Sequence, residues 1–184
     1  MVQATSADDA MSGSMAAPIR LARTGDSTTI ARMSRDEIET GLGWSWRPQR
    51  VLGAIRDPNT LAIVHGHDRV EGFCITQFAE EIGHLSLLAV DARYRRRGLG
   101  RQLVAWMLAS ARVAGLATIH VEMRTTNLTA RAFYRALGFE DAGVVAGYYR
   151  GIESALRMVL SLRSRDLPEV TWEPPTAWRG PQDH

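Results

Sequence analysis

The chain has 184 residues, of which 45% are hydrophobic and 23% are charged, as is typical of a single soluble globular domain. Its formal net charge of +2 is too small for a chain that binds nucleic acid over its whole surface, so we expect no nucleic-acid partner. No apolar run reaches the roughly 18 residues of a membrane span, and the single cysteine, Cys74, excludes an internal disulfide and a zinc site built of thiolates.

The two ends of the chain differ from its middle in composition. Residues 1–17 are small and polar without periodicity, which predicts a disordered segment, and they lack the basic-then-apolar order of a secretory signal. Residues 163–184 hold four of the seven prolines, which predicts an extended tail. We therefore place one domain at residues 18–162 and expect a cytoplasmic protein that is a monomer or weak dimer, with no membrane partner and no metal.

The first half of the domain alternates between strand and helix patterns. We predict a strand, two helices and three further strands at Pro18–Arg23, Asp26–Glu39, Pro48–Arg56, Thr60–Val64, Val70–Phe78 and Gly83–Val90. Asp26 and Ser27 can cap the first helix, and Pro48 suits the first turn of the second. Short polar turns separate the last three strands, which predicts an antiparallel meander.

The second half of the domain begins with a clear helical stripe. We predict a helix, a strand, a helix and two strands at Gly98–Ala114, Thr118–Arg124, Thr129–Leu137, Gly143–Tyr149 and Ala155–Leu162. Because a strand–helix–strand crossover produces parallel neighbours, the sheet should combine both strand directions. The predicted fold class is therefore α/β, with a mixed, partly antiparallel central sheet of about seven strands flanked by about four helices.

A glycine- and arginine-rich turn joins the strand that ends at Val90 to the following helix. The first turn of a helix has unpaired N–H groups and carries the positive end of the helix dipole. Gly98 and Gly100 allow a ligand to approach the backbone closely, and five arginines fall between residues 93 and 101. The turn therefore suits a pyrophosphate, although a plain strand-to-helix turn is the alternative.

Two blocks of sequence resemble a known family. The pattern Arg95-x-x-Gly98-x-Gly100 after residues 85–90 is similar to the coenzyme A-binding motif of the GNAT superfamily of N-acetyltransferases. A second block follows at the family's spacing and contains Asn127, Ala130, Phe133, Tyr134, Gly138 and Phe139. The resemblance covers residues 18–162, and it implies a GNAT fold with acetyl-CoA as cosubstrate.

The resemblance also implies which residues bind acetyl-CoA. Backbone N–H groups of residues 96–101 would bind the pyrophosphate, and residues 88–90 would pair with the pantetheine arm like an added strand. Asn127 would contact the cofactor, and Tyr134 would lie near its sulfur. The complete implied set is Leu88, Ala89, Val90, Arg95, Arg96, Arg97, Gly98, Leu99, Gly100, Arg101, Asn127, Ala130 and Tyr134.

Acetyl transfer to an amine requires a proton donor for the departing thiolate and a proton acceptor for the incoming ammonium. Tyr134, a phenol with a reference pKa near ~10, is the candidate acid. Side chains alternate along a strand, so His120 and Glu122 should share the polar face of strand 118–124. Either can take the proton through water, and we prefer Glu122 while a shared relay stays open.

Other groups are assigned lesser roles. The resemblance implies that the N–H of Ala89 or Val90 stabilises the thioester oxygen. Cys74 lies in an apolar run, which favours a core residue over an acetyl-cysteine intermediate, so we predict direct attack by the amine. The remaining histidines, His65, His67 and His84, show no spacing typical of a metal site.

Within the superfamily, the chain most resembles protein N-terminal acetyltransferases, including the bacterial ribosomal-protein-alanine type. Glu122-x-Arg124-x-x-Asn127 and the separation of twelve residues between Glu122 and Tyr134 are similar to that group. The resemblance implies a peptide or protein N-terminus as partner, with substrate-binding residues at Trp44, Trp46, Tyr148 and Tyr149. The alternatives are a small-molecule amine acetyltransferase and a non-catalytic acyl-CoA-binding sensor. A nucleic-acid module is weaker still, because no aromatic platform accompanies the arginines.

Overall fold

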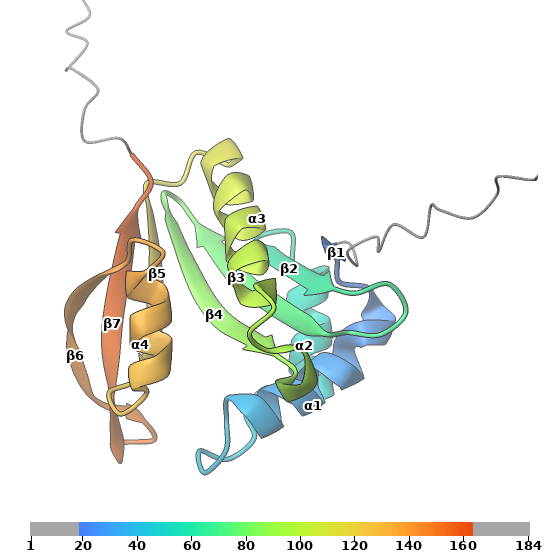
Figure 1. Cartoon of the computed structure of the whole chain (residues 1–184), viewed down its shortest axis with the longest axis horizontal. Coiled ribbons are helices and arrows are strands. Elements are labelled where there is room, and N and C mark those ends of the chain that lie inside the picture. The colour runs from blue at the N-terminus through green and yellow to red at the C-terminus, as the bar shows by residue number, and fades with distance from the viewer. Residues whose placement is uncertain (1–18, 164–184) are drawn as a thin grey trace, which may run out of the picture.

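The computed structural model describes residues 19–163, so the segments predicted to be disordered or extended, 1–17 and all but the first residue of 163–184, lie outside the described residues. The described elements are β1 (Ile19–Leu21), α1 (Ser27–Glu37), α2 (Pro48–Arg56), β2 (Thr60–His65), β3 (Gly72–Ala79), β4 (Ile82–Val90), α3 (Leu99–Val113), β5 (Thr118–Arg124), α4 (Leu128–Arg135), β6 (Glu140–Tyr149) and β7 (Glu153–Ser161) (Figure 1). Short 3₁₀ turns lie at Thr24–Asp26 and Ala92–Tyr94.

The strands form one seven-stranded sheet in the order β1-β2-β3-β4-β5-β7-β6. Every neighbouring pair is antiparallel except β4 and β5, which are parallel and joined by α3. The prediction of an α/β fold with a mixed sheet, about seven strands and four helices is confirmed. The predicted meander is β2-β3-β4, and the predicted crossover is β4-α3-β5.

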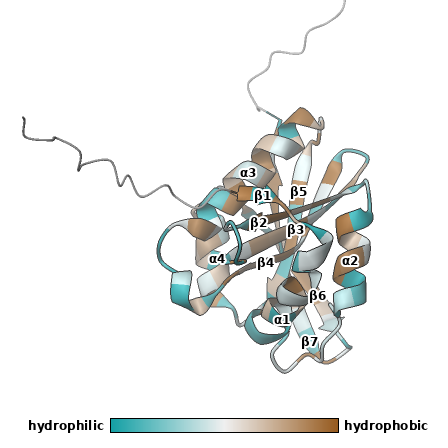
Figure 2. Cartoon of the chain, turned by 90° about the vertical axis from the view of Figure 1, so that its right-hand side faces the viewer, coloured by the Kyte–Doolittle hydropathy of each residue, from teal (hydrophilic) through white to brown (hydrophobic). Residues whose placement is uncertain are grey.

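Helices cover both faces of the sheet, with α1 and α2 on one face and α3 and α4 on the other (Figure 1). The first face buries Ile30 and Val51 of the helices against Phe73 of β3. The second face buries Leu103 and Met107 of α3 against strand residues that include Ile119. The central strands are accordingly the most hydrophobic part of the chain in Figure 2, and burial of their two faces holds the sheet in place.

A β-bulge interrupts β4 at Ser86. Thr76 of β3 pairs with Leu85 and Ile75 pairs with Leu87, so Ser86 is an extra residue on β4. Leu85 consequently packs on the α3 side of the sheet, whereas Leu87 packs on the α1 side. In a regular strand these two side chains would share one face. The bulge therefore reverses which β4 side chains face α1 and α2, immediately before the strand separates from β5.

Some element boundaries differ from the predictions. Helix α1 begins at Ser27, and the predicted cap Asp26 makes no side-chain capping hydrogen bond. Its carboxylate instead accepts hydrogen bonds from Arg20, at 2.8 and 3.1 Å, and from the backbone N–H of Arg23 at 2.7 Å. These charge-assisted bonds replace the weaker cap. Strand β6 begins at Glu140, earlier than predicted, because it already pairs with β7 there.

Candidate active site

Strands β4 and β5 are neighbours over only part of their length. Their parallel ladder runs from Ile82–Thr118 to Leu85–Val121, and beyond it the two strands diverge (Figure 1). A cavity of about 150 Å³, the inner cavity, lies in this opening. It is lined from β4, β5, α1, α4 and the β6–β7 hairpin, by residues that include Ser86, Leu88, Glu122, Asn127, Ala130, Tyr134 and Tyr149.

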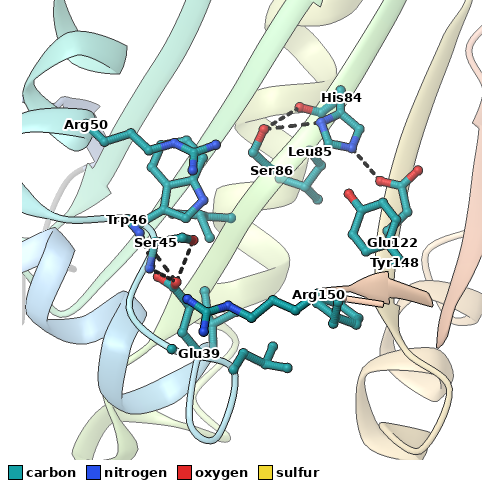
Figure 3. Close-up of a pocket in the computed structure, with 15 residues that line it drawn as sticks. Glu39, Ser45, Trp46, Arg50, His84, Leu85, Ser86, Glu122, Tyr148 and Arg150 are labelled. Carbon is teal, nitrogen blue, oxygen red and sulfur yellow. Dashed lines mark hydrogen bonds and ion pairs between the residues drawn. The ribbon is translucent and has the colours of Figure 1, made fainter. Parts of the chain in front are cut away.

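A second cavity of about 380 Å³, the outer cavity, lies on the α1 and α2 side of the sheet (Figure 3). Its walls come from the α1–α2 segment, from β4 and β5, and from the β6–β7 hairpin with Tyr148 and Arg150. The two cavities share the lining residues Ile38, Leu42, Leu85, Ser86, Leu87, Glu122 and Tyr149. They therefore meet where the strands separate, and two molecules entering from opposite sides could react there.

Glu122 lies at the junction of the cavities and is firmly held. Its side chain is only 5% exposed; Oε1 accepts a hydrogen bond from Arg157 Nε at 2.7 Å, and Oε2 pairs with Nε2 of His84. The hydrogen bond from His84, followed by that from Arg157, lowers the pKa of Glu122 to about 2 against the opposing effect of burial. The carboxylate is therefore an anion with both oxygens engaged, which makes it a weak proton acceptor.

His84 was not among the predicted site residues. It projects into the outer cavity with 37% of its side chain exposed, and its Nδ1 lies 3.2 Å from Ser86 Oγ (Figure 3). His84 and His120 are register partners on β4 and β5, so the face that carries Glu122 also carries His84. His84 and Glu122 are both visible in the sequence as polar strand residues. Their contact could not be predicted, because it depends on the register of two strands that are separated by a helix in the chain.

The other predicted base, His120, lines neither cavity. Its Nε2 lies 3.1 Å from Thr118 Oγ1, back along β5. Burial, followed by the charge of Arg157, lowers the pKa of His120. The alternation that placed His120 and Glu122 on one face of β5 is correct, yet only Glu122 reaches the junction.

Tyr134, the predicted acid, is a wall of the inner cavity and is 6% exposed. Its ring makes edge-to-face contacts with Phe133 and Phe139, each with centroids 5.2 Å apart. Burial raises the pKa of Tyr134 well above its ordinary value, so the phenol is protonated at neutral pH. The aromatic contacts hold the ring in one orientation. Tyr134 therefore packs in the hydrophobic core with one part of its ring and lines the inner cavity with another.

At the predicted pyrophosphate turn, the backbone has positive φ angles at two residues. Gly98 is the N-cap of α3 with a φ of +84°, and Arg96 also has a positive φ of +62°. A Cβ on Gly98 would meet nothing closer than 3.9 Å, so the need for glycine there comes from the backbone angle. Gly100 differs, because its Cβ would lie in ordinary contact with Phe133 at 3.5 Å.

The arginines of this turn have different surroundings. Arg95 is occupied within the protein, since its guanidinium donates to the Val90 carbonyl at 3.1 Å and pairs with Glu37 of α1. Arg97 lies over the ring of Tyr94 at 5.6 Å. Among the described residues, no carboxylate pairs with Arg96, Arg97 or Arg101, so these side chains remain available to an anion at the start of α3.

The remaining predicted cofactor residues fall into two groups. Leu88, Asn127 and Ala130 line the inner cavity, and Asn127 also caps α4 by accepting a hydrogen bond from the Ala130 N–H at 3.0 Å. Ala89 and Val90 do not line it, and they pair with Phe73 and Gly72 of β3.

The predicted acceptor residues are also divided. Tyr148 and Tyr149 line the outer cavity with their rings edge-to-face at 5.0 Å, and burial raises the pKa of Tyr149 to about 12. Trp46 lines it as well, beneath the guanidinium of Arg50 at 4.3 Å. Trp44 lines neither cavity, contrary to its predicted place, because its indole N–H donates to the Ala31 carbonyl at 3.1 Å and holds the ring against α1.

Cys74 is fully buried, and burial raises the pKa of its thiol to about 12. Its interpretation as a core residue is therefore confirmed. Over residues 19–163, no three His, Cys, Asp or Glu side chains gather as a metal site would require. In the same range, no helix combines the length and apolar character needed to cross a membrane.

Comparison with known protein families identifies the family of the chain. Residues 28–139, more than half of the chain, match the Acetyltransferase (GNAT) family. The chain therefore belongs to the GNAT family, as the resemblance indicated.

Two individual proteins that are similar to this chain are N-acetyltransferases. The [ribosomal protein bS18]-alanine N-acetyltransferase of Salmonella typhimurium is 37% identical over 98 residues, which cover 52% of this chain and 66% of that protein. The chain thus spans just under two thirds of this relative's length. The crystal structure of the ribosomal-protein-S18-alanine N-acetyltransferase from Escherichia coli is similar with a TM-score of 0.68 and 26% identity, over 82% of this chain and 98% of that one.

A more distant structure shares the fold alone. The PaiA N-acetyltransferase from Thermoplasma acidophilum, solved in complex with coenzyme A, has a TM-score of 0.65 and 17% identity, and the alignment covers 78% of this chain and 98% of that one.

Proposed function

We propose that the protein transfers the acetyl group of acetyl-CoA to the α-amine of a protein or peptide N-terminus. The observation that carries the proposal is the meeting of the inner and outer cavities at Ser86, Glu122 and Tyr149. Membership of the GNAT family and the N-acetyltransferase activity of the relatives support the same reaction.

The donor would occupy the inner cavity and the start of α3. The N–H groups of the first turn of α3, together with Arg96, Arg97 and Arg101, suit the pyrophosphate. Leu88 and Ala130 offer apolar walls to the pantetheine arm, and Tyr134 lies deeper in the same cavity. The thioester would then face the junction at Glu122.

The acceptor would enter through the outer cavity. After it loses a proton, its nitrogen lone pair attacks the thioester carbonyl carbon, and the carbon–sulfur bond breaks as the carbonyl re-forms. The departing thiolate takes the phenolic proton of Tyr134, which is protonated because burial raises its pKa, and the second proton that the nitrogen loses as the amide forms restores the phenol. The products are an N-acetylated amine and coenzyme A, and no covalent enzyme intermediate is needed.

An N-terminal peptide fits the outer cavity better than a compact amine does. The cavity opens between the α1–α2 segment and the β6–β7 hairpin, where Tyr148 remains 42% exposed. An aromatic ring with a free hydroxyl can pack against an extended backbone and donate a hydrogen bond to it. The relatives that act on the alanine of a ribosomal protein support this choice of acceptor.

The test is thiol release from acetyl-CoA with a panel of acceptors. Hexapeptides that begin with alanine and contain one lysine should be turned over, whereas the same peptides with a blocked α-amine should not. Polyamines and aminoglycosides serve as the small-molecule arm. Turnover of these amines but not of the peptides would contradict the proposed acceptor, and binding of acetyl-CoA without turnover of any amine would favour a sensor.

A further inference from the structure

Three strands each contribute one side chain to a hydrogen-bonded cluster beside the outer cavity. His84 comes from β4, Glu122 from β5 and Arg157 from β7, and the carboxylate lies between the imidazole and the guanidinium (Figure 3 shows the first two). Glu122 and Arg157 are register partners, so the arrangement is fixed by the sheet itself. The cluster is continuous with the junction where acceptor and donor would meet.

The most exposed proton acceptor of this cluster is the imidazole. The Glu122 side chain is 5% exposed and both of its oxygens hold donors, whereas the His84 side chain is 37% exposed within the cavity. The hydrogen bonds from His84 and Arg157 hold the pKa of this carboxyl well below its ordinary value, so Glu122 is a poor acceptor for the proton of an ammonium.

The hydrogen bonds also define which nitrogen of His84 is basic. An ionised carboxylate only accepts, so the nitrogen that faces it, Nε2, carries the hydrogen. Nδ1 therefore keeps its lone pair and lies 3.2 Å from Ser86 Oγ, whose hydroxyl also lies 3.4 Å from the His84 carbonyl oxygen. Ser86 is the bulge residue of β4 and lines both cavities, so its hydroxyl connects the imidazole with the junction.

We propose that His84 is the base of the reaction, that Ser86 passes the proton to it, and that Glu122 is a positioning residue held in turn by Arg157. The proposal rests on the acetyl transfer proposed above. The acceptor ammonium gives a proton to Ser86 Oγ as the Ser86 hydroxyl proton moves to His84 Nδ1, and the freed lone pair attacks the thioester. The imidazolium, paired with the Glu122 carboxylate, then releases the proton to water in the outer cavity.

Charged and titratable groups from several elements face His84. On the sheet it is flanked by Glu122 and His120 from β5, with Arg157 from β7 beyond the carboxylate. Glu39, Arg50, Tyr148 and Arg150 also line the cavity (Figure 3). Glu122 is the anion in direct contact with the imidazole, because Glu39 is occupied by Ser34, Ser45 and the Trp46 N–H.

The experiment compares pH profiles of kcat/KM for an alanine-initiated hexapeptide. In the unaltered protein the rate should rise as a single group loses its proton. His84→Gln should abolish this ascending limb and lower the rate roughly 100-fold, a typical loss for a general base. Glu122→Gln should keep the limb, because the imidazole that takes the proton is still present. Ser86→Ala should lower the rate roughly tenfold, with the limb retained.

Controls separate a catalytic role from a structural one. His67→Gln makes the same change at an exposed turn residue outside both cavities and should leave the profile unchanged. All variants should bind acetyl-CoA, and His84→Gln and Ser86→Ala should melt close to the unaltered protein, whereas Glu122→Gln should be less stable but folded at the assay temperature. Added imidazole should restore activity to His84→Ala, since the site opens to solvent.

Each contrary result has a distinct meaning. An ascending limb that persists in His84→Gln and disappears in Glu122→Gln would assign the base to Glu122 and overturn the proposal. Full activity in Ser86→Ala would show that the proton does not pass to His84 through the Ser86 hydroxyl. If the unaltered protein acetylates no amine, the proposed function fails and the relay fails with it, whereas turnover that is unaffected by His84→Gln overturns the relay alone.

Discussion

The proposed donor side and the proposed acceptor side of this site, called below the donor side and the acceptor side, are built in different ways. The donor side is largely one continuous segment, in which the end of β4, the turn and the first residues of α3 follow each other along the chain. The acceptor side collects single residues from distant places, such as Trp46, His84, Glu122 and Tyr148. A phosphate group can be bound by backbone N–H groups alone, whereas an amine must be deprotonated and oriented by side chains.

This difference predicts where substitutions will act. A change on the donor side should alter acetyl-CoA affinity, and a change on the acceptor side should alter turnover or peptide KM at unchanged acetyl-CoA affinity. Tyr134 and Glu122 lie at or near the boundary, so they test whether the two sides are energetically separate.

The largest effect is expected from Tyr134→Phe. Removing the phenol proton donor should lower kcat by roughly 100-fold or more, because the thiolate must then leave unprotonated. Acetyl-CoA affinity should change less than twofold, since the ring contacts with Phe133 and Phe139 remain. Equilibrium binding of acetyl-CoA and steady-state kinetics measure the two quantities. A collapse of binding with kcat preserved would place Tyr134 with the donor-binding residues and would contradict the acid role.

The second effect concerns stability and comes from Glu122→Gln. The pKa of Glu122 is lowered in the folded state, from 4.5 to about 2, so the carboxylate stabilises the fold above pH ~4.5 and this contribution is lost as pH falls toward 2. The substitution should lower the unfolding free energy at pH 7 by on the order of 2 kcal/mol and flatten its decline between pH 5 and 3. Urea unfolding at several pH values measures both.

Glu80→Gln is the matched control for this stability change. Glu80 is exposed and has no ion pair within residues 19–163, so the unfolding free energy should be nearly unchanged. Equal pH dependence in Glu122→Gln and the unaltered protein would show that His84 and Arg157 do not stabilise the carboxylate.

A third substitution isolates the donor side. Gly98→Ala places a Cβ at a residue with a φ of +84°, which costs about 1–2 kcal/mol and distorts the first turn of α3. Acetyl-CoA affinity should fall roughly tenfold. Gly115→Ala creates the same strain at the other end of α3, where φ is +79° and space is open, so it should cost similar stability without affecting affinity. Equal affinity losses would mean that the turn does not bind the cofactor.

The sequence was sufficient for the features that depend on local pattern. Strand alternation and helical periodicity predicted all seven strands, the four helices and the parallel crossover, because burial imposes these periods directly. The start of α3 just after Gly98 was predicted from glycines at the beginning of a helical stripe. Asp26 was misjudged as a cap because its ion pair with Arg20 joins residues whose contact depends on tertiary structure.

The acceptor side was harder to predict for a physical reason. The contact between His84 and Glu122 requires the register of β4 against β5, and the bulge at Ser86 changes which side chains share a face. Trp44 and Trp46 could not be distinguished, because they lie in an irregular segment. That segment is shaped by the buried carboxylate of Glu39, which accepts hydrogen bonds from Ser45 Oγ at 2.6 Å and from the Trp46 N–H at 3.1 Å.

The smallest effects should distinguish these two tryptophans. Trp44→Phe removes the hydrogen bond to the Ala31 carbonyl and should cost about 1 kcal/mol of stability with peptide KM unchanged. Trp46→Phe makes a wall of the outer cavity smaller and should raise peptide KM roughly threefold. This factor corresponds to the free energy lost with about 25 Å² of apolar contact at ~25 cal/mol/Å². Thermal unfolding and peptide kinetics measure the pair. If Trp44→Phe raised KM and Trp46→Phe did not, the peptide would have to pass along α1 outside the cavity, and the acceptor side would extend beyond the junction residues.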